Sequence, residues 1–168
     1  MRPWLTQQKL SVGGLPSEYE FGRPVVVGSD LELPVTSQAS DGSELFTVLV
    51  SHDGGATFGD LKGGALSVST DYSGPAISDS LGAVTWVVPR GGGKIYVSSD
   101  AGKTWMTVTA SGLTRDVVSI GLTTPTTAVA VMANGTCTGS KVGCSQYHYL
   151  VGTTDGGQTW TSLDPTKP

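Results

Sequence analysis

Three aspartates recur in this chain inside one spaced octapeptide, Ser/Thr-x-Asp-x-Gly-x-Thr-aromatic. The copies are Ser51–Phe58, Ser98–Trp105 and Thr153–Trp160, so they begin 47 and 55 residues apart. A carboxylate that recurs in this way is either a catalytic group or a turn-forming acceptor. An Asp followed closely by Gly reverses the chain while its carboxylate accepts backbone N–H groups. We therefore predict that the three aspartates are structural.

The other recurring positions agree with a hairpin turn. The fifth-position glycine supplies the positive φ that a side chain resists, and the closing aromatic residue begins the next strand and buries a large ring. An apolar run precedes each copy, so each copy is expected to join two antiparallel strands. The positions concerned are Ser51, Asp53, Gly55, Thr57 and Phe58; Ser98, Asp100, Gly102, Thr104 and Trp105; and Thr153, Asp155, Gly157, Thr159 and Trp160.

The octapeptide resembles the Asp-box, or BNR, repeat of sialidases, sortilin-type receptors, a photosystem assembly factor and many secreted bacterial β-propellers. All three copies match it at the Asp, Gly and Thr positions, while the first ends in Phe58 and the third opens with Thr153. The resemblance implies a repeat protein with one four-stranded blade per box. A period of about 40 to 50 residues built from short strands is typical of such propellers. The box itself is mostly a folding device that sits away from the ligand face.

The predicted fold is therefore all-β, with about three four-stranded antiparallel blades in a partial or half propeller. The blades span about 21–70, 71–112 and 113–168, and residues 1–20 form an arm or the remnant of a preceding blade. The expected strands are Pro24–Val27, Leu31–Thr36, Leu45–Val50 and Phe58–Leu61; then Gly74–Ser78, Ala83–Val88, Lys94–Val97 and Trp105–Thr109; then Val117–Leu122, Ala128–Met132, Tyr147–Val151 and Trp160–Leu163.

Three blades do not close a propeller, which needs about four to eight. A three-blade arc leaves two apolar faces open, and large apolar faces mark interfaces. We expect either a second copy, which would complete a six-bladed ring, or further blades of a longer protein. The ligand of such a module would be a glycan or a protein.

The amino-acid composition of the chain indicates which partners and which cellular compartment to expect. Of 168 residues, 24 are Gly and 9 are Pro, and only 14% are charged, which suits a turn-rich secreted or cell-surface β protein. The net charge of −4 argues against a nucleic-acid partner, since phosphate contacts need clustered Lys and Arg. No apolar stretch approaches the length of a membrane helix, and residues 1–10 lack the apolar core of a signal peptide. No cofactor is expected.

The two cysteines, Cys137 and Cys144, are separated by six residues that include two glycines. They could close a small disulfide loop or remain free thiols, and we predict the disulfide, which favours an oxidising compartment. A metal site would need further Cys or His ligands nearby, and the single imidazole of His148 is more typical of an ordinary strand residue. We therefore predict no metal site.

Polar groups on the face opposite the boxes are the candidates for ligand binding. Glu44 lies in the expected loop between the second and third strands of the first blade. Each candidate can equally be a solvated loop residue. The ligand-face candidates are Arg23, Arg90, Arg115, Asp116, Asp71 and Tyr72.

Catalysis is the remaining question. Sialidases use an arginine triad, a Tyr–Glu nucleophile pair and an acidic residue, and the strand Gly22–Val26 is faintly similar to their arginine-bearing first strand. The chain has only four arginines, and all four glutamates lie within its first 44 residues. We predict a non-catalytic module that binds a glycan or protein partner or scaffolds an extracellular assembly. The alternative is a fragment of a sialidase-like glycoside hydrolase whose other blades lie on another chain or copy.

Overall fold

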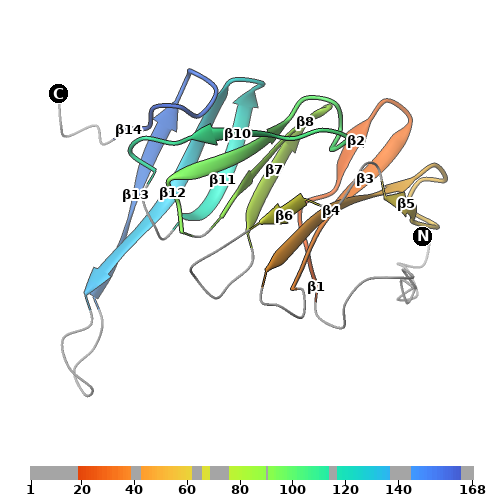
Figure 1. The fold of residues 1–168 in the computed structure, drawn as a ribbon, viewed down its shortest axis with the longest axis horizontal. Coiled ribbons are helices and arrows are strands. Elements are labelled where there is room, and N and C mark those ends of the chain that lie inside the picture. The colour runs from red at the N-terminus through yellow and green to blue at the C-terminus, as the bar shows by residue number, and fades with distance from the viewer. Residues whose placement is uncertain are drawn as a thin grey trace, which may run out of the picture.

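The protein is described by a computed structural model that covers residues 19–38, 43–61, 66–68, 76–89, 91–113, 117–136 and 145–163. Within these ranges every regular element is a β-strand, which confirms the predicted all-β class (Figure 1). The same ranges hold no helix that is long and apolar enough to cross a membrane. The strands form three antiparallel sheets, here called sheets 1, 2 and 3 in chain order.

Sheet 1 has six strands, because each of its two outer places is filled by two short strands instead of one continuous strand. Both β1 and β2 pair with β3, and both β5 and β6 pair with β4. The break between β1 and β2 includes Pro24, which has no N–H to donate to a ladder. The expected strand from Pro24 thus extends back to Tyr19. The strands are β1 (Tyr19–Phe21), β2 (Val25–Val27), β3 (Asp30–Gln38), β4 (Glu44–Ser51), β5 (Gly59–Leu61) and β6 (Leu66–Val68).

Sheets 2 and 3 each contain four strands in chain order. The predicted strands overlap the observed ones, but the first strand of sheet 2 spans Ile77–Leu81 instead of Gly74–Ser78. The second strand of sheet 3 continues to Thr136, four residues beyond the expected end at Met132. The strands of sheet 2 are β7 (Ile77–Leu81), β8 (Val84–Val88), β9 (Lys94–Ser98) and β10 (Met106–Thr109). Those of sheet 3 are β11 (Val117–Thr124), β12 (Thr127–Thr136), β13 (Ser145–Thr153) and β14 (Thr161–Ser162).

The sheets stack in chain order through two apolar clusters (Figure 1). Phe46 and Val48 of sheet 1 pack with Val87 and Tyr96 of sheet 2. The larger cluster joins sheet 2 to sheet 3, and burial of each large side chain in it contributes about 1.5–3 kcal/mol. Its members include Trp86, Val88, Ile95, Val117, Ala128, Ala130, Met132, Val151 and Trp160.

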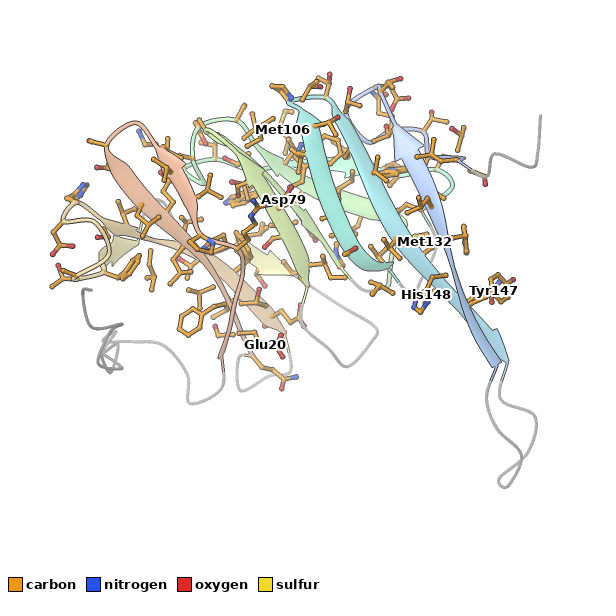
Figure 2. All side chains as sticks on the ribbon, turned by 180° about the vertical axis from the view of Figure 1, so that it is seen from behind. Glu20, Asp79, Met106, Met132, Tyr147 and His148 are labelled. Carbon is orange, nitrogen blue, oxygen red and sulfur yellow. The ribbon has the colours of Figure 1, made fainter. Side chains whose placement is uncertain are left out.

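Two carboxylate contacts reinforce this stacking, one half-buried and one buried. Asp79 Oδ2 on β7 accepts the N–H of Leu122 on β11 at 2.7 Å, which ties sheet 2 to sheet 3 (Asp79 is labelled in Figure 2). Glu44 Oε2 accepts the N–H of Ala76 at 2.9 Å, at the entry to sheet 2. Glu44 begins β4 and is only 5% exposed. The prediction that it lies in a solvated loop was therefore wrong, because its carboxylate is needed by a backbone N–H of the next sheet.

The outer faces of sheets 1 and 3, which point away from sheet 2, differ in exposure. Strand alternation places Val35 and Leu49 on the outer face of sheet 1, and both are fully buried. At the margin of that face Val26 is 68% exposed. On the outer face of sheet 3, Leu150 and Leu163 are 48% and 45% exposed. Two open apolar faces were expected, but only the face of sheet 3 and the margin of sheet 1 are open.

Candidate functional site

Each octapeptide is built around the hydroxyl of its first residue. Ser51 Oγ donates to Asp53 Oδ1 at 2.7 Å and accepts the N–H of Gly55 at 2.7 Å. The second copy repeats both contacts at 2.8 Å with Ser98, and the third does so at 2.8 and 3.2 Å with Thr153. The hydroxyl thus holds both sides of the turn.

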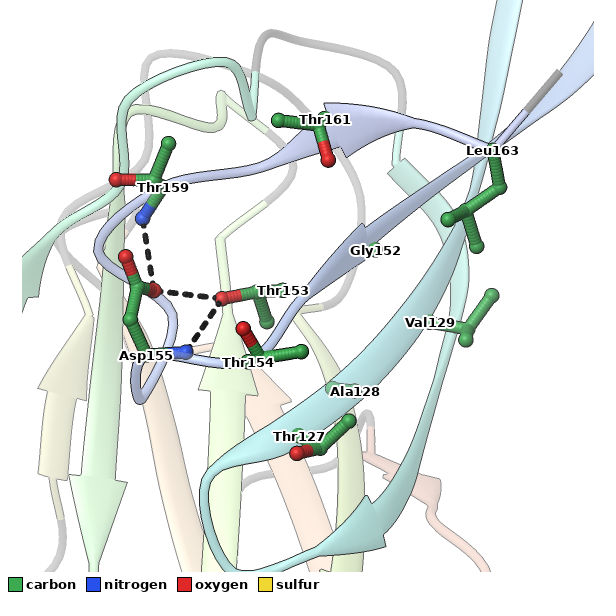
Figure 3. A pocket seen from close by; sticks show the side chains of 10 residues that line it. All are labelled: Thr127, Ala128, Val129, Gly152, Thr153, Thr154, Asp155, Thr159, Thr161 and Leu163. Atoms are coloured by element: carbon green, nitrogen blue, oxygen red, sulfur yellow. Dashed lines mark hydrogen bonds between the residues drawn. The ribbon is translucent and has the colours of Figure 1, made fainter. Parts of the chain in front are cut away.

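The aspartate carboxylates accept the remaining donors of the turn. Asp53 accepts the N–H and the hydroxyl of Thr57 at 2.8 and 2.6 Å, and Asp100 accepts those of Thr104 at 2.9 and 2.6 Å. In the third copy, Asp155 Oδ1 accepts the N–H groups of Gln158 and Thr159, both at 3.0 Å. Figure 3 shows the hydrogen bonds that join Thr153, Asp155 and Thr159 in this last turn. Each carboxylate is therefore occupied by donors from its own octapeptide.

These donors stabilise the ionised carboxylates. The Thr57 hydroxyl is the main cause that lowers the pKa of Asp53 to about 2, and the Thr104 hydroxyl does the same for the pKa of Asp100, also to about 2. The backbone N–H of Thr159 is the main cause that lowers the pKa of Asp155 to about 2. A carboxyl with so low a pKa is a poor proton donor at neutral pH. Their chemistry suits the structural role better than an acid–base role.

The turn requires positive φ at two consecutive positions. The fifth-position glycines have φ of 92°, 82° and 88°, as predicted for Gly55, Gly102 and Gly157. The preceding residue is also left-handed, and in the second copy it is Ala101, with φ of 61°. The fourth position of the second octapeptide thus carries a side chain in a region that normally favours glycine.

Each octapeptide also contacts structure outside itself. Ala101 N–H donates to Ala83 O at 2.8 Å, and Gly156 N–H donates to Thr126 O at 2.9 Å, so these copies are tied to the first turn of their own sheet. Ser111, after β10, donates to Gln158 O and accepts the N–H of Trp160, both at 2.8 Å. The third octapeptide is therefore bonded to the end of sheet 2 as well.

The closing aromatic rings reach the preceding sheet. Trp105 packs edge-on against Phe46 of sheet 1, with ring centroids 5.5 Å apart. Trp160 packs edge-on against Trp86 of sheet 2 at 6.3 Å. The octapeptides thus act as braces between successive sheets.

Of the predicted ligand-face residues, only Arg23 lies within the described ranges. Arg23 is exposed and lies in the interruption between β1 and β2, just before β2. His148 is exposed on β13 (Figure 2), and the described ranges contain no group of three potential metal ligands. The other predictions lie outside the described residues: Arg90, Arg115, Asp116, Asp71 and Tyr72, together with the predicted disulfide partners Cys137 and Cys144.

A histidine–aspartate pair lies beside the first octapeptide. His52 Nδ1 and Asp30 Oδ1 are 2.8 Å apart, next to a cavity of about 210 Å³ that Val50 and Thr57 also line. The His52 side chain is 68% exposed, so water and salt screen the pair. It offers a polar rim to the turn but no enclosed site.

The larger pocket lies on the outer face of sheet 3, beside the third octapeptide (Figure 3). Its volume is about 430 Å³, and Val129, Gly152 and Leu163 give it an apolar floor. Threonine hydroxyls and the already occupied Asp155 carboxylate form its rim. A pocket of this kind can hold an apolar body while offering hydrogen bonds only at its edge.

Sequence reasoning did not single out this pocket. The unbroken apolar run Ala128–Ala133 in β12 is the signal that could have found it, because such a run indicates that both faces of the sheet are apolar. Comparison of the chain with protein-family models, curated proteins and solved structures finds no match. The outer face of sheet 3 is therefore assigned from its own geometry.

Proposed function

We propose that this chain is a non-catalytic Asp-box β-propeller module, in which the three sheets are blades, and that it binds a protein partner through the outer face of sheet 3. The observation that carries the proposal is the pocket of about 430 Å³ beside the third octapeptide, on a face where Leu150 and Leu163 are about half exposed. Large exposed apolar patches on otherwise polar surfaces mark interaction sites.

The repeated role of the octapeptides supports the propeller. In two places a closing aromatic ring packs on the sheet that precedes it. In one of them the backbone is bonded to that sheet as well. The aspartates serve these turns, which favours a scaffold over a catalytic centre.

A protein fits this face better than a glycan does. The floor of the pocket is aliphatic, and aliphatic side chains gain free energy from burial against other apolar groups. Glycan recognition would draw on convergent polar groups, which here are confined to the rim. The secreted or cell-surface location and the scaffolding of an assembly belong to the same proposal.

The first test uses a polypeptide probe. A cyclised hairpin with the sequence of residues 151–162, which includes Trp160, is titrated into the labelled protein and followed by NMR. We expect shifts at Val129, Leu150 and Leu163, which Leu150→Glu abolishes and a peptide with alanine in place of the tryptophan does not produce. Shifts elsewhere on the molecule, or none, would contradict the proposed site.

The second test addresses the hydrolase and glycan alternatives. We expect no hydrolysis of a fluorogenic sialoside by the intact chain. Hydrolysis that Arg23→Ala abolishes would favour the glycoside hydrolase instead. Binding to a glycan array that Leu150→Glu leaves unchanged would show that the ligand is a glycan bound at another face.

A further inference from the structure

The contact between sheets 2 and 3 shows which surfaces of this chain fit together. In that contact the third octapeptide of sheet 3 lies on sheet 2, where a Cβ on Gly157 would overlap Ile95 Cδ1 and lie 3.2 Å from Trp86 Cζ3. Trp160 covers the same indole. The receiving surface on sheet 2 is therefore centred on Trp86 and Ile95.

Strand register identifies the corresponding surface on sheet 3. Thr85 pairs with Ser98, the first residue of the second octapeptide, and Ala128 pairs with Thr153, the first residue of the third. Val129 thus occupies in sheet 3 the place that Trp86 has in sheet 2, because Val129 directly follows Ala128 and Trp86 directly follows Thr85. Leu150 occupies the place of Ile95, since each lies three residues before the octapeptide.

The receiving surface on sheet 3 is open. Leu150 is 48% exposed, and the pocket of about 430 Å³ opens beside Val129. Here the pair of Val129 and Gly152 takes the place of the bulkier pair of Trp86 and Val97. In Figure 3 Val129, Gly152 and Leu163 lie along one side of this hollow. It therefore has the position of the octapeptide-receiving surface and more room than its counterpart on sheet 2.

The complementary surface, which would enter the receiving surface, is the outer face of sheet 1 at the other end of the chain. On sheet 1, Leu31 pairs with Ser51 and with Val26, as Ala128 of sheet 3 pairs with Thr153 and Leu122. Val26 thus has the position of Leu122, which packs against sheet 2.

The octapeptide of sheet 1 lies on this same face. A Cβ on Gly55 would lie 3.2 Å from Leu31 Cδ2 and 3.9 Å from Phe58 Cε2, so the ring of Phe58 lies at the outer face of sheet 1. Phe58 is half-buried and Val26 is 68% exposed, so the margin of this face is accessible. Its centre, at Val35 and Leu49, is already covered.

We propose that a second copy of this chain occupies the open face of sheet 3, with its first octapeptide and Phe58 entering the pocket beside Thr154 and Thr159. This proposal rests on the proposed function, because it identifies the protein partner that binds the outer face of sheet 3. Each copy carries one outer face of each kind, so two copies close through two identical contacts. The closed pair has six sheets, within the range of about four to eight that propellers use.

The test is the mass of the native chain in solution, measured by sedimentation equilibrium at micromolar concentration. We expect twice the chain mass of 17.2 kDa. Val26→Glu and Leu150→Glu each place a charge on a contact face, and each is expected to raise the dimer dissociation constant by about tenfold or more. Met106→Glu is the matched control, because Met106 is 64% exposed on sheet 2 and should leave the constant unchanged.

A mixing experiment tests the orientation of the pair. The Val26→Glu copy keeps an intact sheet 3 and the Leu150→Glu copy keeps an intact sheet 1, so a mixture forms one unmodified contact and one contact that carries both substitutions. We expect a mixed pair that is tighter than the weaker of the two variant dimers and weaker than the unmodified dimer. Failure of the two variants to associate with each other would overturn the proposed pairing of the two ends.

Three further outcomes would overturn the proposal. A folded monomer at all concentrations would show that neither outer face needs a second copy. A ladder of larger species would show that the contact does not close after two copies. A dimer that Leu150→Glu leaves intact would place the contact elsewhere. In the dimer the second copy would compete with the hairpin for this pocket, so the hairpin titration is repeated on the Val26→Glu variant, whose sheet 3 is unmodified. A monomer of that variant that binds the hairpin would retain the proposed function even where the dimer is refuted.

Discussion

The indole of Trp160 packs edge-on against the indole of Trp86, with ring centroids 6.3 Å apart, so that the last octapeptide of the chain is locked to the middle sheet. Trp160 is 5% exposed and its Nε1–H donates to Gly157 O at 3.0 Å. A residue that closes a local turn thereby also holds two sheets together.

Removing this ring should destabilise the fold. We expect Trp160→Ala to lower the free energy of unfolding by about 3–5 kcal/mol, because it leaves a cavity against Trp86. Trp160→Phe should cost less, since the first octapeptide closes with Phe58. Urea unfolding followed by circular dichroism measures both. Met106→Ala, at an exposed site, should cost below about 0.5 kcal/mol, and an equal loss there would refute the argument.

Two neighbouring glycines should respond differently to the same substitution. Gly156 and Gly157 have φ of 76° and 88°, but a Cβ on Gly156 meets nothing within 4 Å, whereas one on Gly157 overlaps Ile95. We expect Gly156→Ala to cost about 1 kcal/mol from strain, and Gly157→Ala roughly 2–4 kcal/mol from strain and overlap together. The urea midpoints of the two variants measure this difference. Equal losses of stability would show that the packing of Gly157 against sheet 2 is unimportant.

The link between sheets 2 and 3 should depend on the acceptor at residue 79. We expect Asp79→Ala to cost about 1.5–3 kcal/mol, because the N–H of Leu122 loses a charged partner. Asp79→Asn keeps an acceptor oxygen and should cost less. Hydrogen exchange at the Leu122 amide is the specific readout, and it should accelerate in the alanine variant. Unchanged exchange there would contradict the link.

Stability should fall in acid through the octapeptide aspartates. Their pKa is about 2 in the folded chain against an ordinary value of 3.8, so the unfolded chain binds more protons between these values. The stabilisation is fully present above about pH 4 and is lost as the pH falls toward 2. Urea midpoints measured across this window should report the uptake of about two protons on unfolding near pH 3.

A variant with Asn at positions 53, 100 and 155 provides the control for the acid experiment. Asparagine cannot titrate, so the variant should be less stable than the wild type at neutral pH and should lose most of the pH dependence. A variant that keeps the full acid dependence would show that other carboxyls cause it.

Much of the fold was predictable because turn chemistry is local. The hydroxyl, carboxylate and glycine of each octapeptide lie within a few residues of one another, so their spacing alone indicated the turn and the two strands beside it. Where the local signal is weak, the prediction was less accurate. The strand at Ile77–Leu81 was placed too early, and the strand at Tyr19–Phe21 was assigned to the arm in part.

By itself, the sequence determined the turns, the antiparallel strands and the apolar alternation of each sheet, because these depend on contacts between near neighbours. Only the tertiary structure decided which side of each sheet is covered. Val129 and Ala128 are apolar neighbours in β12, yet stacking buries Ala128 completely against sheet 2, whereas Val129 on the opposite face is only half-buried. From the sequence Glu44 is expected in a loop, but in the structure its carboxylate accepts the N–H of Ala76, which is 32 positions away in the chain. Such contacts depend on how the sheets stack, which a period of two along one strand does not specify.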